Sequence, residues 1–202
     1  EYYRFCVPFV QKQSYSSPSD LAITCCFFHE KNMALNLFSI RQSGCQATIA
    51  IICDESIQFT AAAIKMINCL KVKVIKSKIP GFMQGVHTDM IRDNFVANYL
   101  KRNKNIYQRV FFFDAFDVFF ESDPFQYFNE SKLYLFKEST QKIKWNRSNR
   151  KWIENCYDRY AFRLLRNQYI VCSGTIAAGS IDEFIKFYTI LYNENNWPKC
   201  VV

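Results

Sequence analysis

The sequence predicts an α/β domain with a mainly parallel central sheet flanked by helices. Short runs of apolar, β-branched and aromatic residues alternate along the chain with segments whose apolar residues recur at helical spacing. One run, residues 109–120, is apolar on both faces, which is typical of a central strand that helices cover on both sides. Because 202 residues, half of them hydrophobic, suffice for one sizeable core, we expect a single domain over residues 1–202.

The expected elements follow one another in a strand and helix alternation. Residues 21–28 and 47–53 are continuous apolar runs that predict buried strands. Between them, Met33, Leu37 and Ile40 predict a helix over residues 32–41. The further expected strands are residues 72–75, 109–120, 133–136 and 169–172, and the further expected helices are residues 59–70, 89–102, 150–165 and a segment opened by the capping box Ser180-x-x-Glu183.

The chain carries 26 Lys and Arg residues against 18 Asp and Glu, a formal net charge of +8. Such an excess favours binding to phosphate groups, but it does not indicate whether they belong to nucleic acid, anionic lipid or a nucleotide. Its densest part, residues 142–166, predicts a solvated helical face, with a phosphate-binding or acceptor-binding surface as the alternative. Since no recognised nucleic-acid-binding motif accompanies the charge, no nucleic acid is expected as a partner.

The nine cysteines include no CxxC pair and no cysteine with a nearby His at zinc-finger spacing, which argues against structural zinc. Two Asn-x-Ser/Thr triplets, beginning at Asn129 and Asn146, would accept glycans in the secretory pathway. No apolar run reaches the roughly 18 residues of a membrane span, so we expect membrane contact only through an anchor outside the chain. The sequence starts at Glu1 and stops at Val202, and we expect pieces to be missing at both ends.

Two carboxylates, Asp114 and Asp117, follow the apolar residues 110–113. Because ligands of open α/β sheets bind at the carboxyl ends of strands, both acids stand where a ligand would bind. Two partly buried carboxylates are costly unless a positive charge lies between them. Mn²⁺ or Mg²⁺ would supply that charge and could also bridge the phosphates of a nucleotide. On spacing alone, the alternative is a turn capped by Asp117, followed by a second turn at residues 122–124.

The surroundings of the two acids resemble a known family. Residues 107–125, YQRVFFFDAFDVFFESDPF, resemble the acidic-motif strand of GT-A nucleotide-diphospho-sugar glycosyltransferases, in the eukaryotic variant with two Asp separated by two residues. Residues 133–139 (LYLFKES), 149–153 (NRKWI) and 170–180 (IVCSGTIAAGS) are similar to later pieces of that family, in the same order. The resemblance covers about residues 20–202 and implies a Rossmann-like GT-A fold.

The resemblance implies a metal-dependent transferase that moves a sugar from a nucleotide-diphosphate donor to a glycan, protein or lipid acceptor. We expect it in the lumen of the secretory pathway, in the Golgi. The resemblance places Asp117 on a divalent metal, Mn²⁺ or Mg²⁺, and Asp114 on the metal or the ribose. The other expected donor-binding residues are Arg92 against the diphosphate, Ser173, Gly174 and Thr175 in a small-residue loop, and Asp54 near the base or ribose.

Alternatives to these assignments come from the residues themselves. Gly174 and Gly179 would let the backbone approach the ligand, but residues 173–175 also fit a tight strand-to-helix turn that needs small residues. Arg92 also fits an ordinary surface position, and His29 and His87 are expected in loops.

Other functional hypotheses remain beside the transferase. A degenerate domain could keep the fold and bind only a nucleotide or a partner, because no later His or acidic group that would complete the site is found after Ser180. A phosphatase with a nucleophilic Asp is disfavoured, since its acids have a different spacing.

Overall fold

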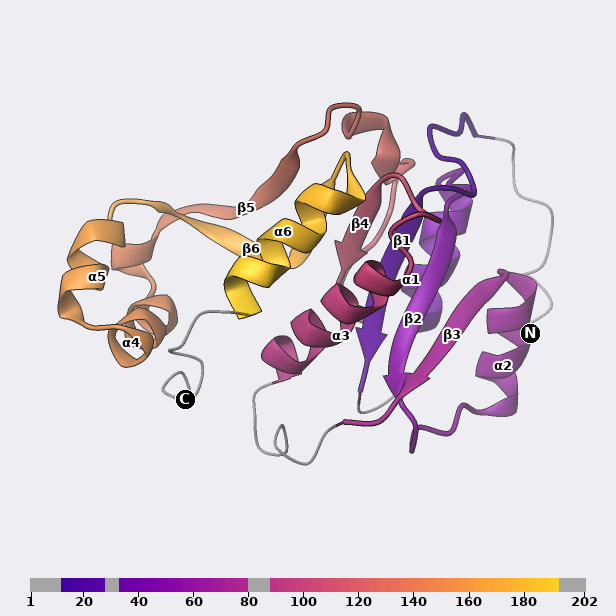
Figure 1. Cartoon of the computed structure of the whole chain (residues 1–202), viewed down its shortest axis with the longest axis horizontal. Helices are drawn as coiled ribbons and strands as arrows, with labels where there is room; N and C mark the ends of the chain where they lie inside the picture. Colours follow the sequence, from indigo (N-terminus) through magenta and orange to yellow (C-terminus); the bar gives the residue numbers. More distant parts are fainter. Residues whose placement is uncertain (1–11, 28–32, 80–87, 193–202) are drawn as a thin grey trace.

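A computed structural model describes residues 12–27, 33–79 and 88–192 and has one six-stranded sheet between two layers of helices (Figure 1). The strand order is β3-β2-β1-β4-β6-β5. Neighbouring strands among the first four are parallel, whereas β6 runs antiparallel to both β4 and β5. The α/β class is confirmed, but the parallel arrangement holds only for β1 to β4. The strands are β1 (Leu21–Cys26), β2 (Thr48–Asp54), β3 (Val72–Ser77), β4 (Val110–Phe113), β5 (Leu133–Lys142) and β6 (Tyr169–Ala178).

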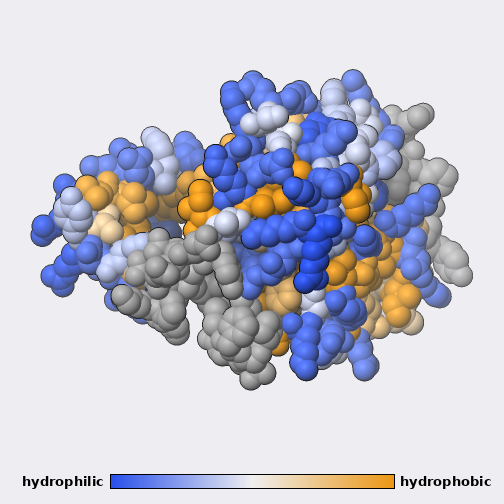
Figure 2. Space-filling view, viewed as in Figure 1, coloured by the Kyte–Doolittle hydropathy of each residue, from blue (hydrophilic) through white to orange (hydrophobic). Residues whose placement is uncertain are grey.

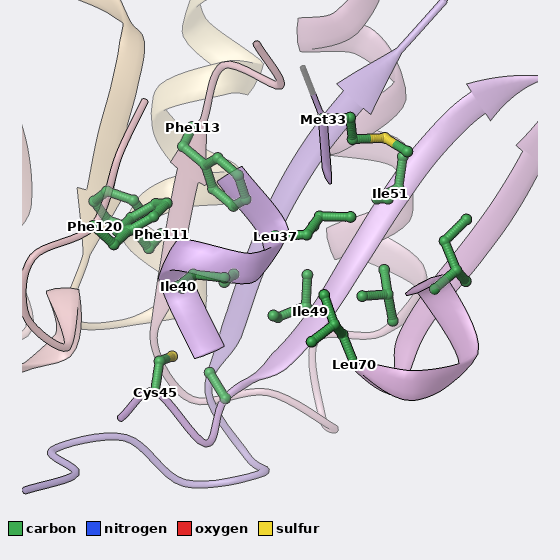
Figure 3. Close-up of a cluster of buried hydrophobic side chains, with 14 of the residues drawn as sticks. Met33, Leu37, Ile40, Cys45, Ile49, Ile51, Leu70, Phe111, Phe113 and Phe120 are labelled. Atoms are coloured by element: carbon green, nitrogen blue, oxygen red, sulfur yellow. The ribbon is translucent and has the colours of Figure 1, made fainter. Parts of the chain in front are cut away.

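Two hydrophobic clusters, one on each face, explain why the central strands are apolar throughout. Helices α1 (Met33–Gln42) and α2 (Ala61–Cys69) cover one face, and α3 (Thr88–Arg102) and α6 (Ile181–Tyr192) cover the other. In β4, Phe111 and Phe113 join the first cluster, while Val110 and Phe112 join the second. Figure 3 shows the first cluster, in which side chains of α1 lie over β2 and beside the phenylalanines of β4. Alternate residues of one strand therefore fill two cores.

The route of the chain makes β1 and β4 the topological switch point of the sheet. From β1 the chain moves outward to β2 and β3, and then returns to the other side of β1 to form β4. The helix that follows β1 and the helix that precedes β4 lie on opposite faces of the sheet. In open α/β sheets, ligands bind outside the carboxyl ends of the two strands at such a switch point. The last residues of β1 and β4 therefore mark the expected site.

Several expected elements have different bounds in the structure, among them β5, which continues from the expected residues 133–136 to Lys142. The strand expected over residues 109–120 ends at Phe113, because a turn over residues 115–117 follows Asp114. The helix expected over residues 150–165 is two helices, α4 (Arg147–Cys156) and α5 (Arg159–Leu165). The side chain of Asp158 accepts a hydrogen bond from the Ala161 backbone at 2.7 Å and so starts the second helix. Strand β6 continues through residues 173–175, where a loop was expected.

Strands β5 and β6 continue beyond the sheet as a ribbon that carries α4 and α5 at its end, on the left of Figure 1. We call residues 137–171 the arm. A short 3-10 helix, η4 (Ile143–Trp145), leads into α4. Within the arm, all of which the structure describes, only Ile143 and Ile170 are buried. The segment is therefore exposed to solvent, as both the solvated face and the alternative binding surface require.

A polar network fixes the amino ends of β1 and β4. Arg109 forms an ion pair of 2.8 Å with the buried Asp20. Asp123 is 1% exposed and starts the 3-10 helix η3 (Pro124–Tyr127), where the second turn was expected. One of its oxygens accepts hydrogen bonds from the backbone of Tyr15 at 2.8 Å and of Ser16 at 2.9 Å. Asp123 is thus a structural anchor at the edge opposite Asp114.

Among the described helices, none is both long and apolar enough to cross a membrane.

Candidate functional site

Asp114 is the first residue after β4 and lies at the carboxyl end of the strand next to β1. Its carboxylate forms an ion pair with Arg92 of α3. The Arg92 side chain is 10% exposed and that of Asp114 is 32% exposed, so solvent reaches the carboxylate but hardly the guanidinium. The Arg92 guanidinium also lies over the ring of Phe112, 5.2 Å from its centroid. Arg92 therefore holds the acid in a partly buried position at the switch point.

Strand β6 forms the other wall around Asp114. The Asp114 backbone N–H donates to the Gly174 carbonyl at 2.8 Å, and Arg92 Nη2 donates to the Ser173 carbonyl at 3.0 Å. A Cβ at Gly174 would overlap the Asp114 carboxylate, with Cγ only 2.7 Å away. A glycine is thus required here for the close approach of the acid and not for a turn. The expected loop over residues 173–175 is wrong, but the small residue is needed all the same.

Helix α1 holds both ends of the acidic segment, residues 114–120. The Asn36 amide donates to the Asp114 carbonyl at 3.1 Å, and the Phe120 backbone N–H donates to Ser39 Oγ at 3.1 Å. Both α1 residues are buried. Neither was among the expected site residues, although Asn36 lies one turn from Ile40 on the apolar side of the expected helix. A polar residue on that side was the available signal.

Asp117 lies on an exposed turn in the middle of this segment. Ala115 and Phe120 on either side are buried in the protein core. Among the described residues, no hydrogen bond or ion pair to the Asp117 carboxylate is present. Asp117 therefore presents its carboxylate to solvent from a short segment fixed at both ends.

A second carboxylate and two neutral groups lie beside Arg92. Arg92 Nε is 3.7 Å from the Asp93 carboxylate. Cys25 and Tyr188 are buried beside Arg92. Burial raises the pKa of the Cys25 thiol and that of the Tyr188 hydroxyl well above their usual ranges. The Arg92 guanidinium is therefore shared between the carboxylates of Asp114 and Asp93, with a neutral thiol and a neutral phenol beside it.

The remaining expected residues lie at different distances from Asp114 along the sheet. Thr175 pairs with Phe113, the last residue of β4, and is half-buried. Asp54 ends β2, two strands away on the same edge of the sheet. Its carboxylate accepts hydrogen bonds from the Ser56 side chain and backbone, and these lower the pKa of Asp54. Asp54 therefore already closes the turn that follows β2.

Gly179 lies at the opposite edge from Asp114. Strand β6 runs antiparallel to β4, so Ala178 pairs with Val110 at the start of β4. A Cβ at Gly179 would overlap the carbonyl of Glu130, with its carbon 2.6 Å away. The expectation that this glycine approaches a ligand beside Gly174 is wrong, because the strand between them separates the two edges. His29 and His87 lie outside the described residues.

The structure thus brings together Asp114, Arg92, Ser173 and Gly174, with Asp117 on the adjoining turn. Within the described ranges, no group of three or more His, Cys, Asp or Glu side chains could hold a metal ion. Neither a protein-family model nor a curated protein matches the chain. The functional proposal accordingly depends on the geometry of this site.

Proposed function

We propose that the protein is a metal-dependent glycosyltransferase of the GT-A type, which binds the diphosphate of a nucleotide-sugar at the carboxyl ends of β1 and β4. The observation that supports this most is the fixed position of Asp114. Arg92, Asn36 and the backbone of β6 hold one acid at the switch point of the sheet. Crevices at such points are where open α/β sheets bind nucleotides.

The two acids have different roles in the proposal. Asp117 is the metal ligand, because its carboxylate is exposed on a turn that α1 fixes at both ends. Asp114 orients a ribose hydroxyl or a metal-bound water, because Arg92 already neutralises one of its oxygens. Magnesium and similar ions in nucleotide sites are bound by one or two carboxylates together with substrate phosphates. This donor set fits Mn²⁺ or Mg²⁺, and the ion would neutralise charge on the departing diphosphate.

The sugar, the diphosphate and the base of the donor would contact other residues at the carboxyl edge of the sheet. Ser173 is exposed beside Gly174 and can offer its hydroxyl to the sugar, and Thr175 follows it on β6. Arg92 places a positive charge beside Asp114 that also attracts the diphosphate. Asp54, at the end of β2, would approach the base or ribose of a nucleotide that extends across β1.

A second candidate is a domain that binds a nucleotide or a partner without transferring sugar. The ion pair between Arg92 and Asp114 favours it, because a carboxylate neutralised by arginine is a weaker metal ligand. As a nucleotide-binding domain, this candidate would use the same site as the first but would not transfer sugar.

A secretory location is part of the proposal. Cys69 and Cys156 are each disulfide-bonded, and disulfides form and persist in oxidising compartments. Asn129, in the first glycosylation triplet, is exposed and could carry a glycan. Asn146, in the second triplet, caps α4 through its side-chain oxygen and is less accessible.

A turnover assay separates the two candidates. The protein is incubated with a panel of UDP-sugars and GDP-sugars in Mn²⁺, Mg²⁺ or EDTA, and release of the nucleoside diphosphate is measured. We expect metal-dependent release that falls at least about 100-fold in Asp117→Asn, as for the loss of a group that stabilises transition-state charge. Asp182→Asn, an exposed acid on α6, is the matched control and should keep the activity. Binding without turnover would favour the second candidate, and neither binding nor turnover would refute both.

A further inference from the structure

The arm has a surface that the proposed donor site does not use. Nine of its residues are Lys or Arg and three are Asp or Glu, so it carries +6 of the chain's formal charge of +8. It also exposes large apolar and aromatic side chains to solvent. These are Trp145, Trp152, Tyr157, Tyr160, Leu164, Leu165, Tyr169 and Val171.

Basic side chains and exposed apolar or aromatic side chains lie next to one another on α4 and α5. On α5, Tyr160 and Leu164 lie one turn apart and are 66% and 62% exposed, and Arg159 and Arg163 lie one turn apart directly beside them. Neither helix buries any residue. Figure 2 shows apolar surface on the arm bordered by hydrophilic surface. This end of the arm is therefore amphipathic, and its large apolar side chains are exposed.

Cation–π pairs order part of this surface. Lys144 lies over Trp145 at 5.2 Å from the ring centroid, and Lys137 lies over Tyr169 at 4.4 Å. Long basic side chains that lie along aromatic rings keep their charged ends in water while the rings remain exposed. Aromatic rings beside Lys and Arg are typical of side chains at the boundary between lipid headgroups and acyl chains.

We propose that the end of the arm, α4 and α5, docks on an anionic lipid surface. In this arrangement Trp152, Tyr160 and Leu164 enter the headgroup region, and the neighbouring Lys and Arg residues contact lipid phosphates. The arm projects away from the sheet (Figure 1), so a flat surface can reach its end without meeting the body of the protein. Paired exposed leucines fit an acyl boundary better than a nucleic acid, whose bases and phosphates offer them little apolar contact.

Vesicle co-sedimentation tests the proposal. The protein is mixed with vesicles of phosphatidylcholine alone or of phosphatidylcholine with phosphatidylserine, at low and at raised salt. We expect binding to the mixed vesicles only, and weaker binding at raised salt because the Debye length shortens from about 10 Å at 0.1 M to about 3 Å at 1 M. Equal binding to both vesicles, or none to either, would overturn the proposal.

Two pairs of matched variants locate the contact. The charge variant is Lys151→Gln, Arg159→Gln and Arg163→Gln, which should lower binding roughly 100-fold at about 1 kcal/mol per basic residue. Its control is Lys65→Gln, Lys101→Gln and Lys104→Gln, three exposed lysines outside the arm that remove the same charge. The control should bind as the parent protein does.

The apolar variant is Trp152→Ser with Leu164→Ser, and we expect about tenfold weaker binding from the lost apolar contact. Its control is Ile64→Ser with Ile106→Ser, two comparably exposed residues elsewhere. All these positions are exposed, and circular dichroism checks that each variant is folded. Unchanged binding of the apolar variant would contradict the proposal. Binding of a labelled single-stranded oligonucleotide in place of vesicles, lost in the charge variant, would overturn it in favour of a nucleic-acid surface.

Discussion

Gly174 and Asp114 lie so close together that any side chain on Gly174 would overlap the Asp114 carboxylate. The two residues come from antiparallel neighbours β6 and β4, and a backbone hydrogen bond of 2.8 Å joins them. The absent side chain leaves the space in which the acid meets Arg92. The site therefore depends on a glycine that never touches a ligand in the proposed function.

Gly174→Ala should displace the Asp114 carboxylate. We expect about tenfold weaker binding of UDP and a loss of about 1–3 kcal/mol in the free energy of unfolding, as for other overpacked positions. Calorimetric titration and urea unfolding measure the two effects. Gly179→Ala is the control, because its Cβ overlaps the Glu130 backbone at the other edge. It should cost stability and leave UDP binding unchanged, and the same loss of binding in both variants would contradict this explanation.

Arg92→Met should destabilise the protein by about 2 kcal/mol, because it removes the guanidinium that pairs with the partly buried Asp114 carboxylate and donates to the Ser173 carbonyl. Urea unfolding measures the change. Arg102→Met, at the exposed end of the same helix, is the control and should change stability little. Adding Asp114→Asn to Arg92→Met should recover part of the loss, since the uncompensated charge is removed. Strict additivity of the two substitutions would argue against an energetically important ion pair.

Asp123→Ala should lower the free energy of unfolding by about 3 kcal/mol without changing nucleotide binding. The substitution leaves several buried or partly buried donors without this acceptor, among them the backbone N–H groups of Tyr15, Ser16 and Phe125. Glu121→Ala, an exposed acid two residues earlier, is the comparison. Equal stability of the two variants would show that Asp123 is not the anchor described above.

The buried thiol of Cys45 should lower the free energy of unfolding at alkaline pH. Burial raises the pKa of its thiol from 9.0 to about 11. Between these values only the unfolded state loses the proton, so the free energy of unfolding should fall as pH rises, by about 2.7 kcal/mol over the two units. Below pH 9.0 the thiol is protonated in both states and contributes no pH dependence. Urea unfolding across this window should show a smaller fall in Cys45→Ala, and an unchanged fall would exclude this thiol as a cause.

The sequence predicts the layers of the fold well where local pattern decides them. Strands β1 and β2 are continuous apolar runs because helices cover both faces, and α1 follows from its apolar spacing. The predicted bounds of an element are wrong where one side chain caps a helix, as Asp158 does when it starts α5 and so divides the expected long helix. The antiparallel direction of β6 was not predicted, because an apolar run does not indicate whether its neighbouring strand is parallel or antiparallel.

The candidate site is only partly predictable from the sequence, because the contacts that assemble it join residues far apart in the chain. Asp114, Arg92, Ser173 and Gly174 were each expected near a donor, and the structure brings these four together. The ion pair joins residues 22 positions apart on different elements, and no spacing rule links them. Asn36 and Ser39 act through hydrogen bonds to the backbone of the acidic segment, and such contacts depend on tertiary packing alone.

The most direct test of the proposed site is the dependence of UDP affinity on Mn²⁺, measured by calorimetric titration of the parent protein and of Asp117→Asn. We predict that Mn²⁺ strengthens UDP binding at least about tenfold, or about 1.4 kcal/mol, in the parent protein and has no effect in Asp117→Asn. Absence of UDP binding with and without Mn²⁺, or an equal Mn²⁺ effect in both proteins, would contradict a metal and diphosphate site at this turn.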